Sequence, residues 1–371
     1  MKMKKGLKNI SLNKTAKSNF ITYGMVIVAF IITEICLSGG LVSSLLKGQL
    51  VPICVYIVMA ISLNLTVGVL GELSLGHAGF MSVGAFSGAV ASAMLQSVIP
   101  DPIVRLVFAL VVGAIFAAII GVLVGIPVLR LNGDYLAIVT LAFGEIIKSL
   151  ITNMYIGMDS NGLHFSMIEK KFELLDGGKM LINGPRGLSG MVPTSSFTVG
   201  VALIMICLIV IFHLVNSKSG RAIMALRDNR IAAESVGINV TTYKMMGFVI
   251  SAAMAGAAGA LFASNYSILL ASKFDFNTSI LVLVFVVLGG LGNMRGSIIA
   301  AALLTVLPEM LRAFSDYRML AYAVVLIGIM LVTHNPAIAA KLEQVKIKFY
   351  KKDALRKKSK LTKKSAEKEV R

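Results

Sequence analysis

The segment from Gly71 to Ala85, GELSLGHAGFMSVGA, places a carboxylate, a hydroxyl and an imidazole between two long apolar runs. Ser74 and His77 are three residues apart, so on a helix both side chains share one face and offer hydrogen bonds to a polar molecule. Gly71 and Gly76 favour a break or bend, because glycine tolerates backbone conformations that other residues avoid. We interpret this segment as a helix break beside a polar pathway. The alternative is a plain structural hinge, with His77 as a packing residue.

A second polar pair lies in the stretch LAFGEIIKSL, where Glu145 and Lys148 are also three residues apart. Opposite charges at this spacing meet on one helix face and neutralise each other. Ionisable groups inside apolar helices are costly and often mark a functional pathway. Glu145 is therefore a candidate pathway residue, and a structural ion pair with Lys148 is the alternative.

The chain carries none of the short motifs that define common catalytic or cofactor sites. GxSxG, HExxH and the phosphate-binding GxxxxGK[ST] do not occur in the sequence, and the four histidines have no metal-ligand spacing. We therefore predict that the chain is not an enzyme and holds neither a metal nor a cofactor. If its work uses ATP, a separate subunit must hydrolyse it.

The elements that must position these residues are long apolar helices. Hydrophobic residues make up 57% of the 371 residues. Apolar runs of about 17–25 residues recur, which is the length of a membrane-spanning helix. Helices satisfy their own backbone hydrogen bonds in lipid, so we predict an all-α integral membrane protein with about ten spans, the first of them uncleaved. The predicted spans are residues 20–38, 49–70, 74–96, 104–129, 135–153, 195–215, 243–267, 279–293, 297–314 and 319–334.

The net charge of +18 is concentrated at the two ends of the chain. Residues 1–19 hold six lysines and no acid, and residues 335–371 hold thirteen Lys and Arg against four acids. Basic flanks of spans mark the cytoplasmic side and lie against anionic lipid, which disfavours nucleic acid as the partner. With ten spans in the cell membrane, both termini are cytoplasmic, residues 154–194 form an external loop, and residues 216–242 form a cytoplasmic loop.

Small residues indicate where the spans pack together. Two spans carry them at every fourth position, with Gly113, Ala117, Gly121 and Gly125 on one and Ser251, Ala255 and Gly259 on the other. Such stripes let helix backbones approach closely in lipid. We predict a tightly packed bundle, which is typical of a transporter or channel and not of a loose anchor.

The loop of residues 216–242 is too polar to span and is helix-prone through Glu234, with a break at Gly237. A short amphipathic helix on the cytoplasmic face is a natural docking element for a partner protein. The alternative is a helix that rests on lipid headgroups.

The chain also contains a short internal repeat. VLGEL at residues 69–73 returns as VLGGL at residues 287–291, and each is followed by a glycine-rich break and another span. Repeats of this kind occur in transporters, although five residues also match by chance.

Five separated motifs resemble one family in the same order. They are the opening segment, close to GxxSLGHAxFxxxGAY with Phe86 where tyrosine is common, then RLNGDYLAIVTLAFGEI, NGPRGL, AESVGINVTTYKMMGFVISAAMAGAAGALFA and GGLGNMRGSIIAA. The family is that of branched-chain amino acid ABC permeases of the LivM type. The resemblance covers roughly residues 45–335 and implies the helix bundle of an ABC importer permease.

The resemblance also implies roles for particular residues. In importer permeases, an Ala-Ala followed a few residues later by Gly marks the helix that inserts into the ATPase subunit. The matching positions are Ala232, Ala233, Glu234 and Gly237. The same family pattern includes Phe80 in the helix-break segment and places that segment near the translocation pathway.

The partners implied by the resemblance are a homologous second permease subunit, two ATPase subunits and an extracytoplasmic solute-binding protein. The function implied is import of branched-chain amino acids by alternating access driven by ATP. Two alternatives stay open at this point: a urea or amide permease of the same fold, and an ion-coupled secondary transporter working alone.

Overall fold

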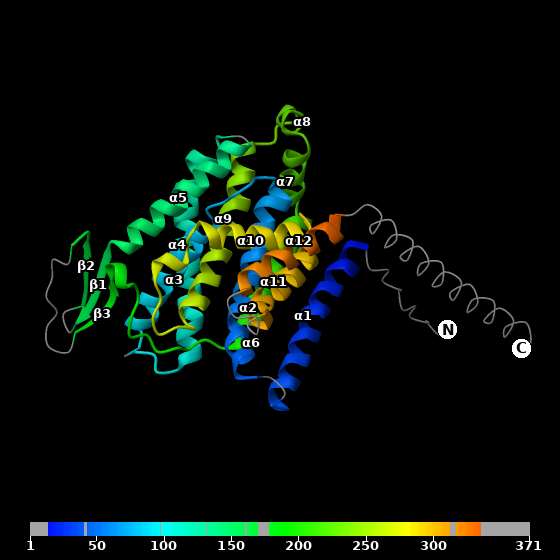
Figure 1. Ribbon diagram of the computed structural model, residues 1–371. Helices are drawn as coiled ribbons and strands as arrows, with labels where there is room; N and C mark the ends of the chain where they lie inside the picture. The colour runs from blue at the N-terminus through cyan, green and yellow to red at the C-terminus, as the bar shows by residue number, and fades with distance from the viewer. Residues whose placement is uncertain are drawn as a thin grey trace, which may run out of the picture. The chain divides into compact units, whose positions relative to one another are not determined.

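The computed structural model describes residues 14–40, 43–96, 98–131, 133–159, 162–169, 178–311 and 317–334. The predicted cytoplasmic segments before residue 14 and after residue 334 lie outside the described residues. The described chain is mostly helical (Figure 1). It divides into two compact units, one ending at Val306 and one beginning at Leu307.

Each of the ten predicted spans falls on a helix. These helices are α1 (Lys14–Ser38), α2 (Ser44–Asn64), which continues as the π-helix η1 (Leu65–Leu70), α3 (His77–Met94), α4 (Pro102–Val128), α5 (Asp134–Thr152), α6 (Phe197–Asn216), α9 (Val240–Ala263), α10 (Phe276–Gly289), α11 (Met294–Met310) and α12 (Arg318–His334).

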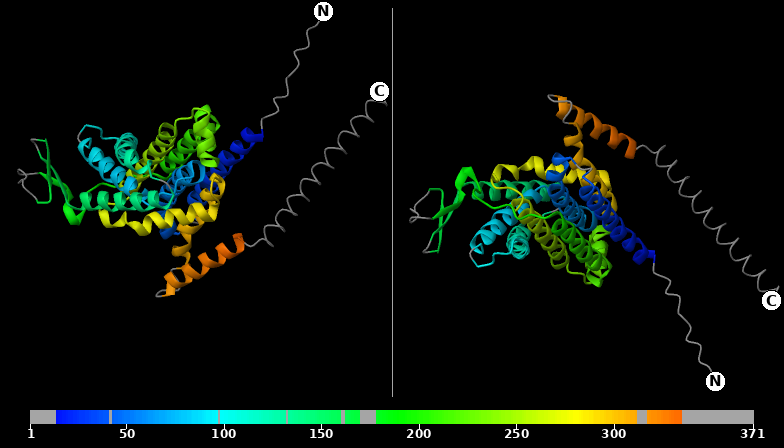
Figure 2. Two further views of the ribbon diagram at one scale, coloured as in Figure 1. Left: turned by 90° about the horizontal axis from the view of Figure 1, so that it is seen from above. Right: turned by 90° about the horizontal axis from the view of Figure 1, so that it is seen from below.

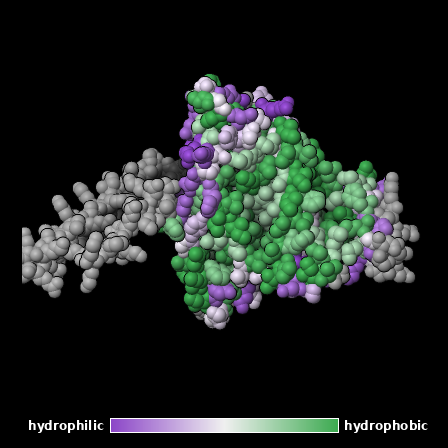
Figure 3. Space-filling model, turned by 180° about the vertical axis from the view of Figure 1, so that it is seen from behind, coloured by the Kyte–Doolittle hydropathy of each residue, from purple (hydrophilic) through white to green (hydrophobic). Residues whose placement is uncertain are grey.

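Seven helical segments within the described ranges are long and apolar enough to cross a membrane. The predicted spans outside this group are α3, with 18 residues, and α11 and α12, with 17 residues each. The face seen in Figure 3 carries a broad hydrophobic area with polar residues along its edges, as expected of a protein embedded in lipid.

Polar residues at the helix starts fix several of these boundaries. Ser43, Asp101, Asn239 and Asp275 each accept a hydrogen bond from a backbone amide in the first turn of the helix that follows. Such caps satisfy amides that have no partner inside the helix. Pro102 occupies the first turn of α4, where its missing amide hydrogen has no cost.

Helices α3, α4 and α9 pack closely, as the small-residue stripes predicted (Figure 1). A methyl group built on Gly84 of α3 would lie 2.0 Å from the carbonyl oxygen of Gly256 on α9. One built on Gly256 would lie 2.3 Å from Cβ of Ala117 on α4. The backbones therefore approach to distances that only small residues permit.

The two stripes do not face each other directly. The small residues of α9 that contact α4 are Ala252, Gly256 and Ala260, each one position after a residue of the predicted stripe. The predicted stripe of α9 instead packs on α3 and α2, because Gly259 meets the carbonyl of Met81 and Ser251 bonds to the carbonyl of Ser62. Helix α9 thus carries small residues on two adjoining faces.

The predicted external loop contains a small sheet that the sequence analysis missed. Strands β1 (Met154–Asp159), β2 (Gly162–Met167) and β3 (Lys179–Asn183) are antiparallel in the order β2-β1-β3. The sheet lies beyond the end of α5 (Figure 2). The described chain is therefore mostly helical, with this small sheet in the loop between α5 and α6.

The sheet and the loop after α9 lie at the same end of the bundle. Leu188, which follows β3, exchanges two backbone hydrogen bonds with Leu269, at 2.9 and 3.0 Å. Helix α9 has 24 residues and so spans about 36 Å. Its first turn consequently lies at the opposite end, where the loop of residues 216–242 enters the bundle.

Candidate functional site

The GELSLGH segment begins where the helix formed by α2 and η1 ends. Gly71 adopts φ +78°, a left-handed conformation that favours glycine, and the chain then runs without regular structure to α3 at His77. A π-helix contains a wider turn than an α-helix and is frequent at functional sites. Residues 71–76 thus separate two helices.

Two sequence-distant helices hold this break in place. The backbone amide of Leu75 donates to Thr140 Oγ1 of α5 at 3.0 Å, and that of Ala78 donates to Ser279 Oγ of α10 at 3.1 Å. Gly76 packs directly on the Thr140 backbone, because an added methyl group would lie 2.0 Å from the Thr140 carbonyl oxygen. The break is therefore anchored on both sides.

The side chains of the break are buried. His77 Nε2 is hydrogen-bonded to Ser62 Oγ of α2 at 2.7 Å, and its ring meets Phe80 edge to face. Phe80 in turn packs edge to face on Phe248 of α9. Ser74 is buried, and within the described part of the chain its hydroxyl has no hydrogen-bond partner. The contacts of His77 favour a packing role.

Glu145 does not join this group. It forms an ion pair with Lys148 on the same face of α5, and both side chains remain partly exposed. The preceding residue, Gly144, packs on Gly76, so α5 contacts the break through Gly144 and Thr140 and not through the Glu145 carboxylate.

A second group of contacts connects η1 to distant segments. The carbonyl oxygen of Gly68 accepts a hydrogen bond from Nη1 of Arg227 at 2.8 Å. Asn64 accepts one from the Gly292 amide at 2.7 Å and donates one to Ser297 at 2.8 Å. We call Asn64, Gly68, Arg227 and Gly292 the Gly68 junction. It joins η1 both to the 216–242 loop and to the break between α10 and α11.

A buried ion pair lies one turn further along. Glu72, directly after η1, contacts Lys244 in the first turns of α9, with side chains only 10% and 8% exposed. A buried charge is tolerated when it is paired. The sequence analysis passed over both residues, although Glu72 stands in the first quoted motif.

The loop of residues 216–242 forms two helices. Helix α7 (Lys218–Asp228) and helix α8 (Arg230–Ser235) meet at Asn229, whose side chain accepts a hydrogen bond from the Ala232 amide at 3.1 Å. The prediction of one helix through Glu234 was therefore wrong, because Asn229 caps a new helix. Gly237 ends the element at φ +84°.

The predicted docking residues differ in exposure. Ala233 is buried in a small cluster with Leu226 and Val240, so it holds the element together. Ala232 is exposed, and so is Glu234, which pairs with Arg230 at 3.0 Å. Two apolar residues of this element are also exposed, with Ile231 80% and Val236 75% accessible.

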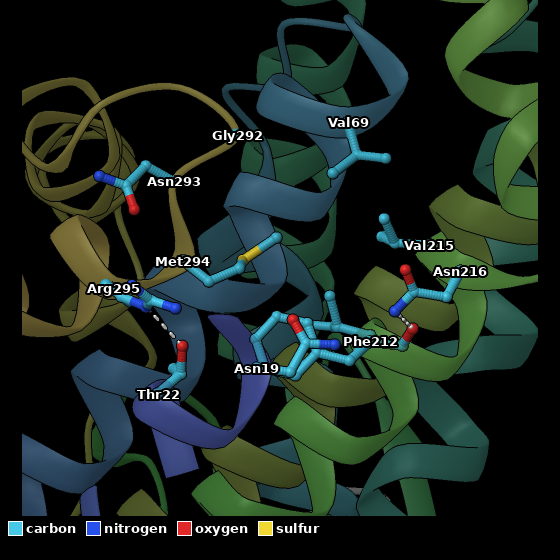
Figure 4. A pocket seen from close by; sticks show the side chains of 11 residues that line it. Asn19, Thr22, Val69, Phe212, Val215, Asn216, Gly292, Asn293, Met294 and Arg295 are labelled. Carbon is cyan, nitrogen blue, oxygen red and sulfur yellow. Dashed lines mark hydrogen bonds between the residues drawn. The ribbon is translucent and has the colours of Figure 1, made fainter. Parts of the chain in front are cut away.

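A cavity of about 250 Å³, lined by both apolar and polar residues, lies beside η1 (Figure 4). Val69 and Gly292 line one part of it, next to the Gly68 junction. Arg295 donates to Thr22 of α1 at 2.7 Å across another part, and Asn216 at the end of α6 lines a third. The last turn of η1 therefore has open space next to it.

The fold and the site define a polytopic helical membrane protein of the transport class. Residues 45–334 match the family model described as branched-chain amino acid transport system / permease component. The chain is similar to the high-affinity branched-chain amino acid transport system permease protein LivM of Escherichia coli strain K12, with 36% identity over 309 residues, which are 79% of this chain and 70% of that protein.

The relation extends to two further proteins. LivM of Salmonella typhimurium is 34% identical over 307 residues, again 79% of this chain and 70% of that protein. The permease protein LivH of the same organism is 26% identical over 157 residues, which are 42% of this chain and 51% of that protein. No solved structure matches the chain.

The chain belongs to the branched-chain amino acid transport permease family and is of the LivM type. It is the permease component of an ABC transport system, a multi-pass membrane protein and not an enzyme. Membership of an ABC permease family implies ATPase partners in a transporter complex.

Proposed function

We propose that this chain forms part of the path by which branched-chain amino acids are imported, through alternating access driven by separate ATPase subunits. Its partners in this proposal are a homologous second permease subunit, two ATPase subunits and an extracytoplasmic solute-binding protein. The observation that carries the proposal is the contact between the α7–α8 element and the helix break, because it connects a docking surface to the interior of the bundle.

Helix α8 is the proposed ATPase-docking element. Its exposed surface consists of Ile231, Ala232, Glu234 and Val236. Its shape depends on the buried Ala233 and on the left-handed Gly237. Apolar residues exposed on a polar element mark interaction sites. The adjoining helix α7 contacts η1 through Arg227, and an element that only rested on lipid headgroups would have no need of this contact.

The proposed orientation follows the charge distribution. The basic segments 1–19 and 335–371 lie in the cytoplasm, together with α7 and α8, and the sheet of residues 154–183 lies outside. The bundle supports this arrangement, since the sheet and the start of α9 lie at opposite ends of that helix.

The helix break is the proposed contact with the translocation pathway. Ser74 supports this role, because a buried hydroxyl without a partner in the described chain is costly unless something else uses it. The shape of the break depends on Gly71, Gly76 and Phe80. Glu145 lies near the break, because the preceding residue, Gly144, packs on Gly76.

Replacing His77 with alanine tests its packing role. The change removes the bond to Ser62 and leaves a cavity beside Phe80, so we expect a loss of about 2–3 kcal/mol in the free energy of unfolding. Thermal unfolding in detergent measures this loss, and the KM for leucine uptake should stay unchanged. A raised KM with unchanged stability would assign His77 to the pathway.

Replacing Gly237 with alanine, or Glu234 with alanine, tests the coupling role. Alanine at φ +84° costs about 1–2 kcal/mol and reorients the end of α8, and loss of Glu234 removes its pair with Arg230. We expect leucine uptake per ATP hydrolysed to fall while the ATPase subunits still assemble. Coupled transport at the normal ratio in both variants would count against docking by α8.

Competition between labelled leucine and urea for uptake identifies the substrate. Cells that carry the whole transport system should take up leucine, with no inhibition by excess urea. Uptake of urea instead would favour the amide permease, and leucine uptake without any ATPase subunit would favour an ion-coupled transporter.

A further inference from the structure

We infer that Arg227 and the Glu72–Lys244 pair form a two-point clamp that makes the helix break move with the coupling element. This inference rests on the proposed docking of α8 to an ATPase and names the residues that carry its motion inward. The two contacts lie on either side of the docking helix in sequence, and both reach the same short segment, residues 68–72.

The first point of the clamp is the end of α7. Gly68 belongs to the last turn of η1, where carbonyl groups have no partner inside the helix. Arg227 supplies that partner with a charged donor, which makes a stronger bond than a neutral one. Its aliphatic stem also packs on Gly71, because an added methyl group there would lie 2.6 Å from Arg227 Cγ. Arg227 therefore holds this segment both by a charge-assisted hydrogen bond to Gly68 and by packing of its stem on Gly71.

The second point is the start of α9. Lys244 lies five residues after Asn239, the cap of that helix, and pairs with Glu72 in a largely buried position. Separating the pair would leave two buried charges without partners, so the contact resists pulling apart. Both ends of the segment that contains α8 are attached to residues 68–72. A displacement of α8 therefore also displaces residues 68–72.

The surroundings of the break let this motion continue. Gly68 and Gly292 are in backbone contact, since a methyl group built on Gly68 would lie 2.2 Å from the Gly292 amide nitrogen. Asn64 holds the same contact from the other side. The cavity of about 250 Å³ beside Val69 and Gly292 provides room into which the last turn of η1 and the break between α10 and α11 can shift together (Figure 4).

The test uses the complete transporter in proteoliposomes, with leucine uptake and ATP hydrolysis measured in the same sample. Arg227→Met keeps most of the stem and removes the bond to Gly68, together with the exposed ion pair of Arg227 with its neighbour Asp228. We expect leucine uptake per ATP to fall about tenfold, the change that loss of one charge-assisted hydrogen bond produces, with ATPase subunits bound in normal amount. Arg227→Lys should restore much of the ratio. Arg221→Met is the matched control, because the side chain of Arg221 of α7 makes a local bond to the Asn216 carbonyl and, among the described residues, none to η1 or the break.

The ion pair is tested by exchange. Glu72→Gln should lower the ratio of uptake to hydrolysis, and the double variant Glu72→Lys with Lys244→Glu should recover it. A merely structural pair would alter thermal stability without altering this ratio. The clamp is overturned if assembled Arg227→Met and Glu72→Gln transporters keep the normal ratio, or if neither Arg227→Lys nor the exchange restores it.

The outcome also separates the clamp from the docking proposal. If variants of Glu234 and Gly237 uncouple the transporter while the clamp variants do not, docking stands and the clamp fails. If the ATPase subunits bind and work normally in all the α8 variants, the docking proposal itself fails.

Discussion

Gly84→Ala should destabilise the helix bundle strongly, because it places a methyl group against the backbone of α9. The new methyl group would lie 2.0 Å from the carbonyl oxygen and 2.3 Å from Cα of Gly256, and both are backbone atoms that cannot rotate away. We expect a loss of about 3 kcal/mol, at the upper end of the range for overpacked cores. The thermal midpoint in detergent should fall by about 6–12 °C.

The matched control is Gly24→Ala. Gly24 also lies within a long apolar helix, but an added methyl group has nothing within 4 Å. This variant should match the parent or be slightly more stable, since alanine favours helix. Equal midpoints for the two variants would show that α3 and α9 are not in close contact.

Replacing Ile231 and Val236 together with aspartate should release the ATPase subunits. The two side chains are 80% and 75% exposed, so neither change disturbs the interior of the permease. If they insert into a partner, each truncation of an apolar anchor costs about 2 kcal/mol or more, which is roughly a thirtyfold loss of affinity. Co-purification of the permease with the ATPase subunits in mild detergent measures the effect.

Thr241→Asp is the control for this experiment. Thr241 is exposed and lies just beyond the docking helix, in the first turn of α9. It should leave co-purification unchanged. Normal recovery of the ATPase with the double aspartate variant would remove α8 from the interface, and loss of the ATPase in the control would point to a general effect of charge.

The helices were predictable because each carries its own signal. Apolar length located the ten predicted spans, and four-residue spacing of small residues located the packing faces of α4 and α9. The sheet was missed because its signal is short and lies in a polar loop. Leu163, Phe165 and Met167 do alternate with polar residues, which is the period of a strand.

The Gly68 junction was beyond prediction from local patterns. Arg227 and Gly68 are 159 positions apart, and Asn64 and Gly292 are 228 apart. No periodicity within one segment reports such a contact. The repeat of VLGEL as VLGGL was the best indication of this contact in the sequence, since the end of η1 lies against the break after α10.

The π turn between Leu65 and Leu70 makes the length of this segment as important as its composition. In an uninterrupted α-helix each residue advances by about 100° around the axis, whereas the wider π turn delays that rotation. The carbonyl of Gly68 lies in this turn and faces Arg227. Removing one residue before Gly68 would rotate this carbonyl relative to Arg227. We therefore expect residues 65–70 to tolerate insertion or deletion poorly.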